Sequence, residues 1–134
     1  MQDLHFEISD SGNLIRLDNF KIRGREEWVT ADVTVKNPVF KGFFAADFQL
    51  YDFESLKNDF LQLVNDFNGV AKLTPLEDGL ILNMKGDGLG HFDIKCEAAN
   101  YNYGSLVFNF SFDQTQLPRL INELDKIIDF VKSA

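Results

Sequence analysis

Residues 106–131 read LVFNFSFDQTQLPRLINELDKIIDFV, and the hydrophobic period changes part-way along from two to about 3.6 residues. In the first half every second residue is apolar, as in a strand with one buried face: Leu106, Phe108, Phe110 and Phe112. In the second half the aliphatic residues fall on one stripe of an α-helix: Leu117, Leu120, Ile121, Leu124, Ile127, Ile128 and Val131. A strand followed by an amphipathic helix is typical of an α+β protein.

The rest of the chain carries the same two patterns. Alternating apolar residues predict strands over residues 4–8, 13–22, 28–35 and 44–50. A helical stripe follows Asp52, whose carboxylate suits an N-cap, and it ends at Asn68-Gly69, where glycine tolerates a left-handed backbone. Short alternating segments separated by glycine-containing turns then lead to residue 112.

This order of elements predicts an α+β fold. Two amphipathic helices cannot bury their stripes on each other and also cover all the strands. We therefore expect a single curved, mainly antiparallel sheet of about seven strands, with both helices packed on its apolar face. With 134 residues and no linker or repeat, the chain is expected to be a single domain, residues 1–134.

Composition excludes several classes of protein. The chain is 45% apolar, with 21 acidic and 13 basic residues and a net charge of -8. The apolar content is too high for disorder, and no apolar run approaches the ~20 residues of a membrane span. The net charge disfavours nucleic acid, which needs clustered lysine and arginine. With no signal-peptide pattern and one cysteine, we expect a cytoplasmic protein that neither spans nor binds a membrane.

Catalytic and metal-binding signals are weak. Cys96 is predicted to be buried between Ile94 and Ala98, as a small apolar side chain. The pairs His5/Glu7 and His91/Asp93 each put an imidazole and a carboxylate on one side of a strand, and on adjacent strands they could bind zinc or iron. The simpler interpretation is that both pairs are solvated. We therefore predict no catalytic residue, no metal and no cofactor, and hence no enzyme.

Aromatic residues on the outer faces of the strands are the one candidate binding feature. Alternation places Trp28, Phe43, Tyr51 and Tyr103 opposite the aliphatic side, with Asp32 and Asp47 nearby. Exposed aromatic residues mark interaction sites, so these six residues form a candidate protein-binding surface. The alternative is that the curved sheet folds back over them, or that a loop covers them.

Several segments resemble the WapI family of small bacterial immunity proteins. They are Trp28–Val33, the helix entry Leu50–Leu56, the turn Pro75–Leu80, and the final phenylalanine-rich strand with its helix. The resemblance covers roughly residues 27–131. It implies an intracellular protein that protects its producer against a contact-dependent toxin, and it assigns no functional residue.

Three functions are therefore open. The first is a non-enzymatic immunity protein whose acidic surface attracts a basic toxin domain. The second is a small-ligand-binding or enzymatic domain with a pocket in the curved sheet. The third is a homo-oligomeric structural protein that buries its aromatic face; the sequence leaves the oligomeric state open.

Overall fold

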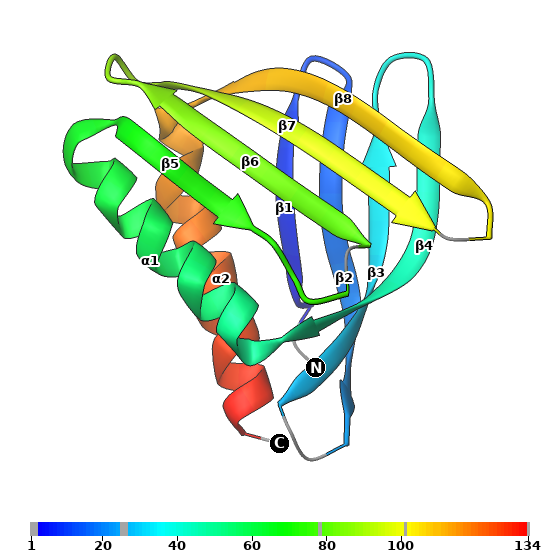
Figure 1. The fold of residues 1–134 in the computed structure, drawn as a ribbon. Coiled ribbons are helices and arrows are strands. Elements are labelled where there is room, and N and C mark those ends of the chain that lie inside the picture. Colours follow the sequence, from blue (N-terminus) through cyan, green and yellow to red (C-terminus); the bar gives the residue numbers. More distant parts are fainter. Residues whose placement is uncertain (1–2, 25–26, 78, 101, 134) are drawn as a thin grey trace.

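The structure is a computed structural model that describes residues 3–24, 27–77, 79–100 and 102–133. Asp78, in the turn at residues 75–80, lies outside these ranges. Within them the chain forms the following elements (Figure 1): β1 (His5–Asp10), β2 (Asn13–Arg23), β3 (Trp28–Lys36), β4 (Lys41–Gln49), α1 (Leu50–Asp66), β5 (Asn68–Leu73), β6 (Leu80–Asp87), β7 (His91–Asn100), β8 (Gly104–Asp113), a 3-10 turn (Gln114–Gln116) and α2 (Leu117–Lys132).

The α+β class is confirmed, but the expected single sheet of about seven strands is wrong. The strands form two four-stranded antiparallel sheets, with the orders β1-β2-β3-β4 and β5-β6-β7-β8. We call them the N-terminal sheet and the C-terminal sheet. The division falls at α1: the chain leaves β4 directly into the helix, and on its return β5 pairs with β6 instead of β4.

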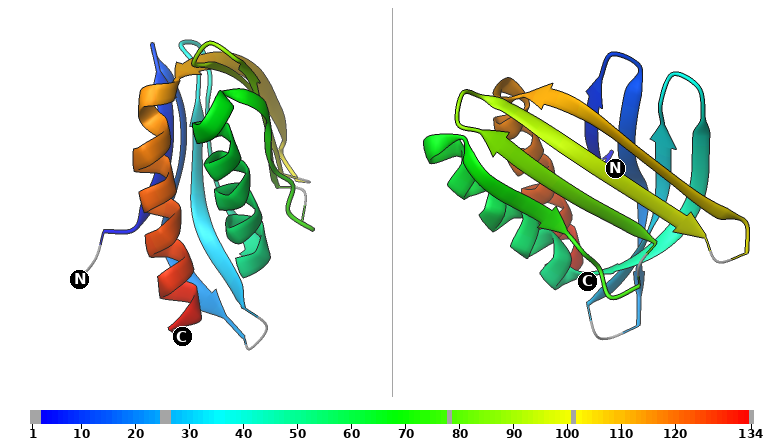
Figure 2. Two further views of the ribbon diagram at one scale, coloured as in Figure 1. Left: turned by 90° about the vertical axis from the view of Figure 1, so that its left-hand side faces the viewer. Right: turned by 45° about the horizontal axis from the view of Figure 1, so that its top comes forward.

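The helices also differ from the expectation, because they do not share the face of one sheet. They pack against each other, with α1 along β5 and α2 along β1. Figures 1 and 2 show both helices on the same side of the molecule, beside the two sheets. The two apolar stripes thus close one side of a core whose other walls are the sheets.

The core explains the alternating pattern of the sequence. One face of each sheet is buried in a common cluster, and the largest buried side chains come from both sheets and α1: Phe6, Phe48, Phe53, Phe60 and Phe92. Burying such side chains stabilises a fold by about 1.5–3 kcal/mol each. The opposite face of each sheet is left for polar residues and for the candidate site.

The first turn of α1 begins slightly earlier than predicted. The helix starts at Leu50, and Asp52 is its third residue, within the first turn, where its carboxylate accepts a hydrogen bond from the backbone N–H of Gln49 at 2.8 Å. Such a contact satisfies an amide that would otherwise be unpaired at the helix start. Asp52 therefore still stabilises the helix start, from inside the helix. Among the described residues, no helix is long and apolar enough to cross a membrane.

Candidate functional site

Four of the six predicted surface residues lie on the outer face of the N-terminal sheet. Trp28 and Asp32 belong to β3, and Phe43 and Asp47 belong to β4. Phe43 is 66% exposed, and the other three are partly exposed. Within the described residues neither a loop nor the other sheet buries Phe43, so the alternative of a covered aromatic face does not hold for this residue.

Hydrogen bonds fix the two acids of this face. Asp47 accepts from the Oγ1 of Thr30 at 2.7 Å and from the Nη1 of Arg23 at 3.1 Å. Asp32 accepts from the amide nitrogen of Asn19 at 2.9 Å. Asp47 is therefore partly neutralised by an arginine, whereas Asp32 is held by a neutral side chain.

A chain of hollows follows β4 and brings some of the predicted residues together. We call it the β4 groove. At one end Trp28 and Asp47 line a hollow of about 320 Å³ together with Arg23 and Glu77. A small hollow of about 150 Å³ continues past Ala45, sharing Asp47 and Glu77 with the first.

The wide end of the β4 groove lies between the sheets. Here a hollow of about 570 Å³ shares Ala45 with the small one, and its lining includes Phe43, Tyr103 and Leu106. Tyr103, in the turn between β7 and β8, is 91% exposed. The structure thus places Trp28 and Asp47 at one end of the groove and Phe43 and Tyr103 at the other.

Two predicted residues lie outside the β4 groove. Tyr51, in the first turn of α1 and 70% exposed, lines a separate hollow with Glu54 and Lys132. Asp32 lines none of the hollows described here. The six residues therefore do not form one continuous patch.

Two exposed apolar residues just before β4 are not among those predicted from the sequence. Val39 and Phe40, in the turn between β3 and β4, are 77% and 61% exposed. The side chain of Asn37 accepts hydrogen bonds from both of their backbone N–H groups, at 2.8 and 2.7 Å, and holds the turn in shape. The available signal was an apolar pair directly after Asn37-Pro38, where a solvated turn is normally polar.

The two histidine–acid pairs do not meet. His5 and Glu7 lie on β1 of the N-terminal sheet, whereas His91 and Asp93 lie on β7 of the C-terminal sheet. In the described part of the chain, no cluster of three or more histidine, cysteine or acidic residues could hold a metal ion.

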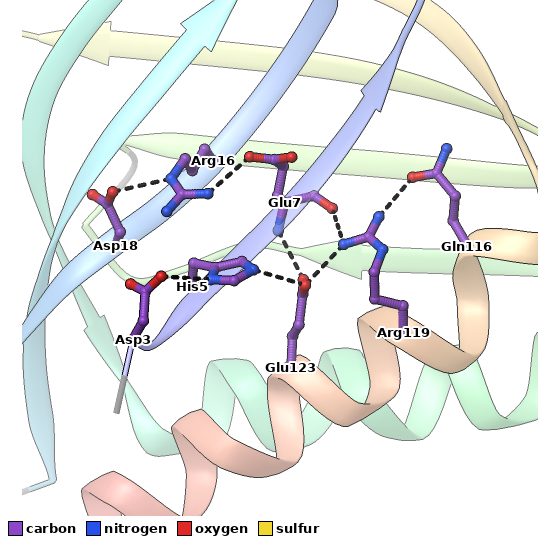
Figure 3. A network of polar contacts seen from close by, with 8 residues as sticks. All are labelled: Asp3, His5, Glu7, Arg16, Asp18, Gln116, Arg119 and Glu123. Atoms are coloured by element: carbon purple, nitrogen blue, oxygen red, sulfur yellow. Dashed lines mark hydrogen bonds and ion pairs between the residues drawn. The ribbon is translucent and has the colours of Figure 1, made fainter. Parts of the chain in front are cut away.

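His5 instead belongs to a polar network between β1 and α2 (Figure 3). Its Nε2 lies 3.1 Å from Glu123 on α2, and the same carboxylate accepts from Nη1 of Arg119 at 2.8 Å. On the other side of β1, Arg16 forms ion pairs with Glu7 and Asp18 at 2.9 and 3.0 Å. The network joins strands to a helix, and its residues line none of the hollows described here, so its arrangement is that of a structural contact.

Cys96 is fully buried, as the alternation predicted. Burial, with a smaller contribution from the neighbouring charge of Glu97, raises the pKa of its thiol to about 12. Because the thiolate is the reactive form, this side chain is not suited to nucleophilic chemistry at neutral pH.

Another hollow, of about 720 Å³, lies across the exposed face of the C-terminal sheet. Three lysines line it, Lys72, Lys85 and Lys95, in a protein whose net charge is -8. Asp93 also lines it and accepts a hydrogen bond from Ser111 at 2.6 Å. The lining thus offers three ammonium groups and several polar groups for binding.

Comparison with known proteins places the chain in a family. The model of the immunity protein WapI-like family matches residues 2–131. The chain belongs to the immunity protein WapI-like family. The resemblance inferred from the motifs over residues 27–131 is thereby confirmed, and the match extends to β1 and β2.

Other comparisons bear on the fold alone. No curated protein matches this WapI-like chain. The solved structure described as "Crystal structures of trypanosoma bruciei MRP1/MRP2" is similar to it with a TM-score of 0.53 and 11% sequence identity, over 97% of this chain and 86% of that chain. At this identity the likeness concerns the fold only.

Proposed function

We propose that this protein is a non-enzymatic, cytoplasmic immunity protein that binds and neutralises a contact-dependent toxin domain. The observation that carries the proposal is the family match over residues 2–131. An immunity protein works by occupying its toxin, so the surface that contacts the toxin is its functional site.

The β4 groove is the contact surface we propose. It combines two exposed aromatic side chains, Phe43 and Tyr103, with a hollow of about 570 Å³ between them and the adjoining strands. Aromatic residues beside a hollow are the anchors that carry most binding energy in protein interfaces. Val39 and Phe40 extend this apolar surface at the turn before β4.

Charge supports the choice of a basic partner. The net charge of -8 gives the protein a negative field that speeds encounter with a positively charged domain. We therefore expect association with the toxin to slow markedly as salt is raised, because screening shortens the range of this field.

The first test is whether this gene lies directly downstream of the gene for a large toxin, whose C-terminal domain then serves as the probe. Co-expression of the immunity protein should restore growth to cells that make that domain, and the two should co-purify. The double variant Phe43→Ser/Tyr103→Ser should lose protection while remaining folded. Leu89→Ser is a matched control, because Leu89 is 82% exposed in the turn between β6 and β7 and lies outside the β4 groove.

Two outcomes would count against the proposal. Failure of the wild-type protein to protect or to bind would remove the immunity function. Equal protection by the Phe43/Tyr103 variant and by Leu89→Ser would keep the function but move the binding surface elsewhere.

A second candidate function rests on the three lysines of the C-terminal sheet. Lys72, Lys85 and Lys95 around one hollow favour a small anionic ligand. Inorganic phosphate and pyrophosphate are suitable probes: a rise in melting temperature that Lys85→Ala abolishes would support this function, and the absence of any shift would refute it.

A further inference from the structure

The outer edge of β4 offers backbone groups that the fold does not use. In an antiparallel pair, alternate residues direct their N–H and C=O toward the partner strand and away from it. Two hydrogen bonds just beyond the ends of the β3–β4 ladder show which residues of β4 direct their backbone groups toward β3. Leu50 N–H donates to Glu27 O at 3.0 Å, and Asn37 N–H donates to Phe40 O at 2.9 Å. Because residues 40 and 50 point toward β3, the even-numbered residues of β4 do so too, and residues 43, 45 and 47 direct their backbone groups away from β3.

These three positions have no partner on that side within the described residues. None of their backbone N–H groups donates a hydrogen bond outside the β3–β4 pairing. Their side chains, Phe43, Ala45 and Asp47, all line the β4 groove. The unpaired edge and the groove therefore run along the same five-residue stretch.

The other edge strands are covered differently. On β1, the N–H of Glu7 donates to the Glu123 carboxylate of α2. β5 lies along α1, and β8 contacts β1. In the described part of the chain, β4 contacts β3 extensively and α1, its own continuation, only slightly, while Gly79 lies close to the inward-facing side chains of Ala46 and Phe44.

We propose that an extended segment of the toxin domain adds to β4 as a fifth strand of the N-terminal sheet. This inference rests on the proposed immunity function and specifies how the toxin binds. Strand addition to an open sheet edge is a common way to bind peptides, with main-chain hydrogen bonds for affinity and side-chain hollows for specificity. The segment runs antiparallel to β4, and one of its apolar side chains enters the hollow between Phe43 and Tyr103.

Charges along the edge define the chemistry of the segment. Lys36 and Lys41 lie opposite each other at the start of β4, while Asp47 and Glu77 line the other end of the groove. Arg23 offsets only one of these two acids, through its ion pair with Asp47. An antiparallel segment complements this pattern when it carries a lysine or arginine in its first half and a carboxylate in its last.

The decisive variant is Ala45→Pro. Ala45 is exposed, and its N–H points away from β3, so proline removes a donor that only an added strand would use. Asn109→Pro is the matched control, because the N–H of Asn109 in β8 also points away from its partner strand. The hydrogen bond from Gln114 N–H to Gly90 O at 2.8 Å shows this, since even-numbered residues of β8 then face β7.

We expect Ala45→Pro to weaken binding of the purified toxin domain by about 30-fold, since the main-chain hydrogen bond from the residue 45 N–H is lost and the carbonyl that it served in the added strand is left unpaired. Asn109→Pro should change it by less than about twofold. In wild type, hydrogen exchange of amides 43, 45 and 47 should slow on toxin binding. Lys41→Glu, which leaves the backbone intact, should weaken binding and keeps the test valid if Ala45→Pro does not fold.

The outcomes separate the two proposals. If the wild-type protein binds no toxin domain, both the immunity function and strand addition fail. If the toxin binds but Ala45→Pro matches Asn109→Pro and the three amides exchange unchanged, the function stands and strand addition is overturned. Wild-type protein that is dimeric through β4 would also overturn it, because a second copy would then occupy the edge.

Discussion

The carboxylate of Glu123 on α2 accepts a hydrogen bond from the backbone N–H of Glu7 on β1 at 3.0 Å, across 116 positions of sequence. The same carboxylate receives Nη1 of Arg119 at 2.8 Å and lies 3.1 Å from Nε2 of His5 (Figure 3). Glu123 is only 8% exposed. One buried acid thus joins the first strand to the last helix, and it satisfies an edge amide of β1 that would otherwise be open to another chain.

Replacing this acid should cost more stability than replacing an exposed one. We expect Glu123→Ala to lower the free energy of unfolding by about 2 kcal/mol, because it leaves the Glu7 amide unsatisfied and Arg119 without its carboxylate. Glu54→Ala is the control: it removes an exposed ion pair with Lys132 at 3.4 Å, worth about 0–1 kcal/mol. Urea unfolding measures both. Equal losses would show that the network contributes no more than a surface pair.

The thiol of Cys96 should react only when the protein unfolds. Burial raises its pKa to about 12, so almost no thiolate exists at pH 8 in the folded state. We expect negligible labelling by a thiol reagent in buffer and one rapid equivalent in denaturant. In intermediate urea, the labelling should follow the unfolding curve. Fast labelling of the native protein would mean that the β7 region opens independently of global unfolding.

The elements could be predicted from the sequence because each has one buried face. Alternation over residues 106–112 matches β8, and the aliphatic stripe from Leu117 matches α2, since both face the same core. The two-sheet arrangement could not be predicted in this way. Period-two alternation shows that a strand has a buried face, but it does not show which strand lies beside it. Tertiary packing determines that β5 pairs with β6.

The same limit applies to the site. Exposure of Phe43, Tyr51 and Tyr103 follows from their positions opposite the apolar faces, and the structure has all three exposed. That Phe43 and Tyr103 line one hollow depends on how the end of the C-terminal sheet lies over β4, which local sequence does not encode. The alternation that groups Tyr51 with them does not continue past Gln49, because α1 begins at Leu50, and Tyr51 lines another hollow.

Two aspartates should shift the pH dependence of stability in opposite directions. Burial raises the pKa of Asp52, partly offset by the hydrogen bond from Gln49. Hydrogen bonds from the Leu89 and His91 amides lower the pKa of Asp87, with a smaller contribution from the His91 charge. Folding therefore favours the protonated form of Asp52 but the ionised form of Asp87.

The sign follows from proton linkage. As pH rises above about 4, the ordinary pKa of aspartate, ionising the buried Asp52 costs stability. The stability of Asp52→Asn should therefore rise relative to that of wild type as pH increases. Ionised Asp87 contributes stability above that pH, and this contribution is lost as pH falls through its lowered pKa. The stability of Asp87→Asn should therefore fall relative to that of wild type as pH rises. Thermal unfolding between pH 3 and pH 7 measures both. Parallel profiles for the two variants would refute the assignment.

Gly86 in β6 should tolerate no side chain, because it lies against the residue that ends α1. A Cβ at Gly86 would overlap the carbonyl oxygen of Phe67 and would lie 2.9 Å from a ring carbon of Phe92. Phe67 has a left-handed backbone (φ 58°), and its carbonyl accepts a hydrogen bond from Gly88, so it cannot move away freely. We expect Gly86→Ala to cost about 3 kcal/mol or more, the upper range for overpacking.

Gly24→Ala provides the comparison for that substitution. Its added Cβ would meet none of the described residues within 4 Å, and its positive φ of 69° is the unfavourable feature. That strain costs about 1–2 kcal/mol. Chemical denaturation of both variants separates steric contact from backbone strain. Suppose that Gly86→Ala lost no more stability than Gly24→Ala. The end of α1 and the start of the C-terminal sheet would then be free to move apart. In that case the close contact between Phe67 and Gly86 would not determine how the two sheets are positioned.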